Sequence, residues 1–259
     1  MRLYILADME GISGIGTLEH TRRESPEFVE GCALMMAEVQ TVVAEALRCG
    51  ATRVVVCDTH GGGGQLQTEK MDPRAVYETP DSARWMPSLN ASFDGLILLG
   101  QHARAGTLNG FLDHTINSAS WFEYRLNDQV CGEIGMAAAY AGHYDVPVIM
   151  LTGDEAAVEE GKALLGNIPG VAVKRGLGRN RAECVPAAEA NTLIKEAACE
   201  ALGTAAALTP FKPTLPARVR LTLYRSDMAD RLASRSGTKR IDARTVERII
   251  TSLLDICPF

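Results

Sequence analysis

Three apolar runs in the first hundred residues each end in polar residues. Residues 3–7, 53–57 and 95–99 are rich in Ile, Leu and Val, which is typical of buried strands. A longer segment, 26–49, has helical periodicity and lies between the first two runs. This alternation predicts a parallel sheet that is covered by helices.

The same alternation continues in the middle of the chain. Residues 122–131 have the pattern of a hairpin, and a strand is predicted at 146–151 between helices at 133–142 and 154–165. The polar, glycine-containing stretch 103–120 is predicted to be a long functional loop.

The last third of the chain has a different pattern. Strands are predicted at 171–174 and 217–224, and helices at 186–202 and 242–256. A proline-rich connector, 208–216, separates the two strand–helix groups.

We therefore predict an α/β fold that consists of a three-layer α/β/α core and a smaller α+β lobe. The core, with a mostly parallel sheet, is predicted over residues 1–165, and the C-terminal lobe over residues 166–259. One continuous domain is the alternative to this division.

Composition excludes several classes of partner. The chain of 259 residues has a formal net charge of -6, so there is no electrostatic reason to expect nucleic acid or an anionic membrane. No apolar stretch reaches 18 residues, which argues against a membrane span. Short basic clusters at 22–23 and 179–181 are expected on solvated surface.

The cysteines indicate a reducing compartment. There are seven of them, an odd number, and none forms a C-x-x-C pair. We expect reduced and mostly buried thiols. The apolar run at the start of the chain is too short for a signal peptide, so a cytoplasmic location is predicted.

Residues that can bind metal follow each of the first three strands. Asp8 and Glu10 point the same way in extended backbone, and Asp8 could bridge two ions through its two oxygens. His60 and His102 follow the second and third strands. Because parallel strands share one carboxyl edge, these side chains should converge. Taken singly, each has an ordinary alternative: a turn-forming Asp, a solvated Glu or a loop histidine.

Two further candidates come from later in the sequence. Glu133 stands at a predicted helix start, where the helix dipole favours a carboxylate with or without a metal. His114, twelve residues after His102, could exchange protons near neutral pH. The alternative for His114 is a loop histidine that hydrogen-bonds to Asp113 or to solvent.

Five of these residues are candidate metal ligands: Asp8, Glu10, His60, His102 and Glu133. If they meet, their chemistry is that of a two-metal hydrolase. Three carboxylates and one bridging hydroxide balance the charge of two divalent ions, and imidazole ligands favour zinc. The hydroxide would be the nucleophile. The serines have no nucleophile-elbow context that would offer another mechanism.

Five short segments follow one another within the first 165 residues: 8–14 (DMEGISG), 58–60 (DTH), 100–105 (GQHARA), 132–135 (GEIG) and 144–148 (YDVPV). In order and spacing they resemble the M55 family of zinc D-aminopeptidases. The resemblance implies two Zn²⁺ ions per subunit, with Asp8 as the bridging ligand. It implies that Glu10 and His60 complete one site, and that His102 and Glu133 complete the other. His114 matches the residue proposed as catalytic in that family.

The resemblance also implies an activity and an assembly. The expected reaction is removal of N-terminal D-amino acids, D-alanine-like, from short peptides. The expected assembly is a homo-oligomer, and the resemblance implies a decamer. A two-metal amidohydrolase or phosphoesterase is the alternative enzyme, and a peptide-binding protein with a structural metal is the alternative without catalysis. A phosphate site would need convergent basic side chains, and Arg104 is the only obvious candidate near a ligand.

Overall fold

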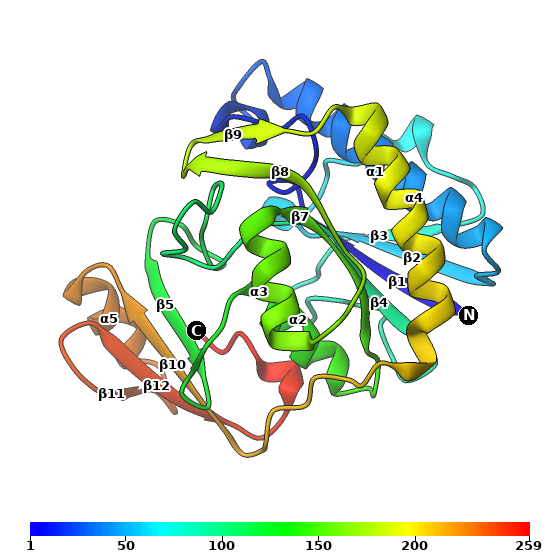
Figure 1. Ribbon diagram of the computed structural model, residues 1–259. Coiled ribbons are helices and arrows are strands. Elements are labelled where there is room, and N and C mark those ends of the chain that lie inside the picture. The colour runs from blue at the N-terminus through cyan, green and yellow to red at the C-terminus, as the bar shows by residue number, and fades with distance from the viewer.

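The computed structural model describes residues 1–259 and contains two sheets (Figure 1). The larger sheet has seven strands in the order β3-β2-β1-β4-β7-β8-β9, and only β9 runs antiparallel to its neighbour. Its strands are β1 (Arg2–Ala7), β2 (Arg53–Asp58), β3 (Val76–Glu78), β4 (Gly95–Gln101), β7 (Val148–Asp154), β8 (Gly170–Gly178) and β9 (Arg181–Cys184).

Helices cover both faces of this sheet. They are α1 (Phe28–Arg48) and α4 (Ala187–Thr204) on one face, and α2 (Glu133–Gly142) and α3 (Glu155–Leu165) on the other. Successive strand residues point to opposite faces, so Leu3 packs with α1 and α4 whereas Tyr4 packs with α2. The predicted three-layer core with a mostly parallel sheet is confirmed.

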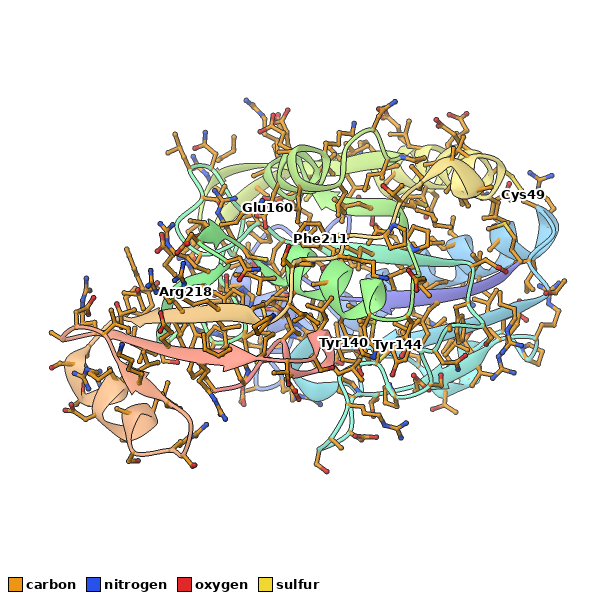
Figure 2. The ribbon with its side chains drawn as sticks, turned by 90° about the horizontal axis from the view of Figure 1, so that it is seen from below. Cys49, Tyr140, Tyr144, Glu160, Phe211 and Arg218 are labelled. Carbon is orange, nitrogen blue, oxygen red and sulfur yellow. A yellow bond between two sulfur atoms is a disulfide. The ribbon has the colours of Figure 1, made fainter.

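The smaller sheet is antiparallel and has the strand order β11-β12-β10-β5-β6. Its elements are β5 (Trp121–Leu126), β6 (Gln129–Val130), β10 (Ala217–Leu223), α5 (Ser226–Ala233), β11 (Lys239–Arg240) and β12 (Thr245–Ile250). Figure 2 shows this sheet at one end of the molecule, with α5 on its outer side. Its inner residues, such as Tyr124 and Leu221, belong to the same apolar cluster as α2.

The two sheets exchange segments of sequence. Strands β8 and β9 of the larger sheet follow residue 165, and strands β5 and β6 of the smaller sheet precede it. The division into domains 1–165 and 166–259 stays a prediction. Five short 3-10 helices complete the fold: η1 (Leu18–Thr21), η2 (His60–Gly62), η3 (Thr68–Lys70), η4 (Ala205–Ala207) and η5 (Leu253–Asp255).

The predicted helix at 242–256 is wrong. Asp242 instead forms a turn in which its side chain accepts hydrogen bonds from the backbone N–H groups of Arg244 and Thr245. Strand β12 follows and pairs with β10. The β-branched residues of this segment suit a strand, and its apolar spacing alone could not distinguish the two structures.

The expectation that all cysteines are reduced is also wrong. Cys49, at the end of α1, and Cys199, in α4, form a disulfide. The two helices pack against each other and bring together residues that are 150 positions apart in the sequence. The other five cysteines are free. None of the helices combines the length and the apolar character that crossing a membrane requires.

Candidate metal centre

The carboxyl ends of β1, β2 and β4 form one edge of the larger sheet. Strand β1 lies between the other two, and its last residue, Ala7, pairs with Asp58 on one side and Leu99 on the other. The chain leaves β1 toward β2 and later returns to the opposite side as β4. Loops that follow neighbouring strands therefore diverge here, which is where open α/β sheets bind ligands.

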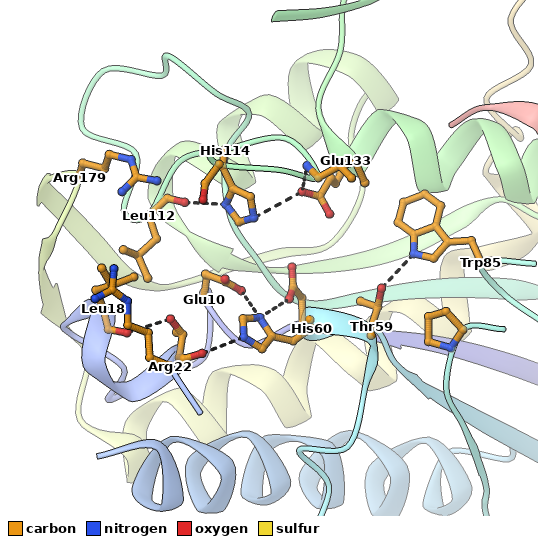
Figure 3. Close-up of a pocket in the computed structure, with 17 residues that line it drawn as sticks. Glu10, Leu18, Arg22, Thr59, His60, Trp85, Leu112, His114, Glu133 and Arg179 are labelled. Carbon is orange, nitrogen blue, oxygen red and sulfur yellow. Dashed lines mark hydrogen bonds and ion pairs between the residues drawn. The ribbon is translucent and has the colours of Figure 1, made fainter. Parts of the chain in front are cut away.

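The turn after β1 and the turn after β2 bring three site residues together. His60 Nδ1 lies 2.9 Å from Glu10 Oε2 and 3.4 Å from Asp8 Oδ1 (Figure 3). The other ring nitrogen, Nε2, donates to the carbonyl oxygen of Thr21 at 3.1 Å. Asp8 and Glu10 are buried. We call this set, Asp8, Glu10 and His60, the first triad.

A second group forms around His102, which follows β4. His102 Nε2 lies 3.4 Å from Glu133 Oε1, at the first residue of α2. The ring of His114 stacks on His102, with 3.9 Å between ring centroids. His114 Nε2 is 3.8 Å from Glu133 Oε1. We call His102, His114 and Glu133 the second triad.

Asp8 connects the two triads. Its Oδ1 faces His60, and its Oδ2 lies 3.5 Å from His102 Nε2. One carboxylate therefore presents a separate oxygen to each histidine. All six residues that the sequence singled out lie together at this edge of the sheet.

Two buried charged residues hold the turn that carries Glu10. Lys174 of β8 donates from Nζ to the carbonyl oxygens of Glu10 (2.7 Å) and Ile15 (2.6 Å). Glu38 of α1 accepts a hydrogen bond from the backbone N–H of Ser13 at 2.7 Å. Burial lowers the pKa of Lys174 to about 8 and raises the pKa of Glu38 to about 7. This turn is thus fixed from both sides.

A strained loop carries His114. Leu112 and Ile116 both have left-handed backbone, with φ values of 51° and 57°, which is rare for bulky side chains. The backbone N–H of Ile116 donates to Glu133 at 2.7 Å, and His114 Nδ1 donates to the carbonyl oxygen of Leu112 at 2.8 Å. Such strain persists only where surrounding contacts enforce it, and it is commonest at functional sites. The loop therefore fits the functional role predicted for it.

Asp58 organises the glycine-rich loop after β2. Its Oδ2 accepts hydrogen bonds from the backbone N–H groups of Gly64, Gln65 and Leu66. The four consecutive glycines at 61–64 have little conformational preference of their own, so the loop depends on such hydrogen bonds. The loop fixes the position of His60, which begins it.

Charge in the site is shared between carboxylates and histidines. Burial, and then the charge of Glu10, raise the pKa of Asp8 to about 6. Burial opposes a positive charge on His60, but Glu10 and Asp8 outweigh it and raise the pKa of His60 to about 12. Burial likewise opposes a charge on His102, yet Glu133 raises its pKa well above the usual range. The buried carboxylates therefore favour positive charge at the positions of the two histidines.

The donor set fits zinc. His102 Nδ1 donates to the carbonyl oxygen of Ala103, so the ring is oriented by its backbone partner. The other nitrogen, Nε2, is buried and has no hydrogen-bond partner, although it faces Asp8 and Glu133. A buried nitrogen without a hydrogen-bond partner costs free energy unless it binds a ligand. Imidazole and carboxylate donors together favour zinc or a neighbouring transition metal over magnesium or calcium.

A cavity of about 590 Å³ opens onto both triads. Trp85 lines it and donates from Nε1 to Thr59 Oγ1 at 2.9 Å. Arg22 and Arg179 also line it. The basic clusters 22–23 and 179–181, which were expected on solvated surface, thus each contribute one arginine to the cavity. Arg104 is not among the lining residues and instead pairs with Glu160 at 3.5 Å.

A ligand-binding sheet edge with a buried set of carboxylates and imidazoles defines the class of metallohydrolases. Comparison with known proteins gives the family. The model of the peptidase M55 family, described as D-aminopeptidase, matches residues 1–258. This chain belongs to that family, and it is a D-aminopeptidase of the M55 metallopeptidases.

Two relatives illustrate the similarity. The D-aminopeptidase of Bacillus subtilis (strain 168) is 34% identical over 215 residues, which cover 82% of this chain and 78% of the relative. A solved structure is described as the zinc-dependent D-aminopeptidase DppA from Bacillus subtilis, a self-compartmentalizing protease. It superposes with a TM-score of 0.95 at 30% identity and covers 99% of this chain and 94% of that one.

Proposed function

We propose that this protein binds two zinc ions per subunit and removes N-terminal D-amino acids, D-alanine-like, from short peptides. The observation that carries the proposal is the position of Asp8 between the two triads, with one oxygen toward each histidine. A carboxylate in this position suits a bridge between two ions. The zinc dependence of the similar DppA structure supports the choice of metal.

The proposed ligands divide between the two ions. Glu10 and His60 would hold one ion, His102 and Glu133 would hold the other, and Asp8 would contact both. When bound, zinc supplies a Lewis acid that makes water ionise near neutral pH and that polarises the peptide carbonyl. Burial of Asp8 and Glu10 keeps bulk water from weakening these interactions.

His114 is the proposed proton carrier. Because its Nδ1 donates to the carbonyl oxygen of Leu112, the ring has a fixed orientation. Nε2 faces Glu133 at 3.8 Å and lines the cavity. This nitrogen can take a proton from the attacking water and deliver it to the leaving amine.

The proposed assembly is a homo-oligomer. The similar DppA structure is described as a self-compartmentalizing protease, which supports an assembly that encloses its active sites. A decamer stays a prediction for this chain. Mass photometry of the purified protein would give the subunit number directly.

The experiment that tests the function compares stereoisomers on one enzyme preparation. The zinc-loaded protein is assayed on D-alanyl and L-alanyl dipeptides, and product amine is quantified. We expect hydrolysis of the D-alanyl substrates only, loss of activity after chelation and recovery when zinc is restored. Preference for L-alanyl peptides would contradict the stereochemical part. Faster hydrolysis of a phosphate monoester than of any peptide would support the phosphoesterase alternative.

A further inference from the structure

Two arginines on separate segments line the cavity beside the triads. Arg22 follows η1, and Arg179 lies between β8 and β9. Figure 3 shows both on the same side of the cavity, across from Trp85. Neither contributes to the metal centre described above, so their positive charge is available for another task.

The backbone holds each arginine close to a site histidine. The carbonyl oxygen of Thr21, the residue before Arg22, accepts the hydrogen bond from His60 Nε2 at 3.1 Å. The carbonyl oxygen of Arg179 accepts from the backbone N–H of Leu112 at 2.7 Å, and Leu112 in turn anchors His114. Movement of either arginine backbone would therefore disturb a site histidine.

Both side chains retain capacity to bind an anion. Arg22 forms no ion pair. Arg179 contacts Asp113 only through Nε, at 3.4 Å, and its side chain is 44% exposed. Asp113 also accepts a hydrogen bond from the backbone N–H of Gly106. Of the terminal nitrogens of Arg179, Nη1 donates to Asn180 Oδ1 at 3.3 Å on the exposed surface, and Nη2 has no partner. Together with the unpaired guanidinium of Arg22, it can donate to a carboxylate.

We infer that Arg22 and Arg179 form a subsite for the C-terminal carboxylate of the peptide substrate. The inference rests on the proposed function, because an aminopeptidase places the scissile carbonyl at the metal centre. In a di- or tripeptide the free carboxylate then lies one or two extended residues away, roughly 3.5–7 Å. The substrate class is short peptides with an unblocked C-terminus.

The peptide itself supplies the anion that the arginines need. The three acidic side chains of the metal centre already have partners in the histidines and in the cations they would hold. A peptide with a neutral side chain carries one negative group, its C-terminal carboxylate. Charge-assisted hydrogen bonds to such a group change affinity by roughly 10- to 100-fold. The subsite would therefore select short peptides with a free C-terminal carboxylate over longer chains and over C-terminal amides.

The test compares D-alanyl-D-alanine with D-alanyl-D-alaninamide, which differ only in the charge at the C-terminus. For the wild-type enzyme we expect kcat/KM to be about 10- to 100-fold higher for the acid, with most of the difference in KM. In the Arg22→Ala/Arg179→Ala double variant this ratio should fall to near one. The Arg22→Lys and Arg179→Lys variants keep the charge but lack the paired N–H donors of a guanidinium, so they should give intermediate ratios.

Arg181→Ala is the matched control, because it removes an exposed charge two residues from Arg179 and outside the cavity lining. It should keep the wild-type ratio. A wild-type ratio near one, or an unchanged ratio in the double variant, would overturn the subsite. If the wild-type enzyme cleaves neither compound while it is fully loaded with zinc, the proposed function itself fails.

Discussion

The two triads differ in what positions them. Asp8, Glu10 and His60 follow directly from strand ends, and the first of their turns is held by the buried side chains of Lys174 and Glu38. In the second triad, His114 depends on a long loop with strained backbone. The sheet therefore fixes the first triad, whereas loop contacts fix the residue proposed to move protons.

This difference separates two roles within one site. A rigid strand-end position suits a residue that must hold a cation at a set distance. A loop position suits a residue that must meet the substrate, because the loop brings His114 to the cavity wall while the scaffold keeps its ends in place. Variants on each side should accordingly affect metal binding and turnover to different degrees.

Asp8→Ala should have the largest effect, because it removes the one residue common to both proposed zinc positions. We expect less than one zinc ion per chain by elemental analysis and a loss of turnover of at least about 1,000-fold. The control is Asp230→Ala, which changes an exposed residue of α5. An Asp8→Ala protein that retains two ions would contradict the bridging role.

His114→Ala should separate chemistry from metal binding. Loss of the proton carrier should lower kcat by about 100- to 10,000-fold, while zinc content stays at two ions per chain. The control is His143→Ala, an exposed histidine outside the cavity lining. Loss of one zinc ion would instead make His114 a ligand, which its proximity to His102 and Glu133 permits.

Lys174→Met should weaken only the first triad. Without its ammonium group the turn that carries Glu10 loses two hydrogen bonds, and zinc affinity at that position should fall about 10- to 100-fold. Competition with a chelator would measure the affinity of the two ions separately. The control is Lys195→Met, which changes an exposed residue of α4. An equal loss of zinc affinity at both positions would contradict the distinction between the triads.

Glu38→Gln should change how the stability of the metal-free protein depends on pH. Burial raises the pKa of Glu38 from 4.5 to about 7, so the folded state binds more protons than the unfolded state between these values. Stability should therefore fall as pH rises through this window, by roughly 1 kcal/mol per pH unit at most. Chemical denaturation should show a flatter profile for Glu38→Gln, and an unchanged profile would argue against this titration.

The sequence predicts most of the centre because of where the strands end. Asp8, His60 and His102 each follow an apolar run, and parallel pairing necessarily brings those ends to one edge. Glu133 and His114 were candidates from the sequence as well, but an ordinary alternative remained for each, since a helix-start Glu and a loop His are common for other reasons. The family resemblance supplied the stronger argument for their roles.

Other residues at the site could not be predicted from the sequence around them. Lys174 lies in a strand 164 positions after Glu10, and nothing in the spacing indicates that its ammonium group is buried. Arg22 and Arg179 look like ordinary surface charge, because the cavity that they line is formed only when distant loops pack together. The strand at Thr245–Ile250 was mistaken for a helix because β-sheet pairing is a long-range interaction.

Anomalous scattering at the zinc absorption edge would test the central claim most directly. Crystals of the zinc-loaded protein should show two peaks per chain. One should lie about 2.0–2.2 Å from ligand atoms of Glu10 and His60, the other at the same range from His102 and Glu133, and both within reach of Asp8. A single peak, or a second peak away from Asp8, would contradict the two-zinc centre.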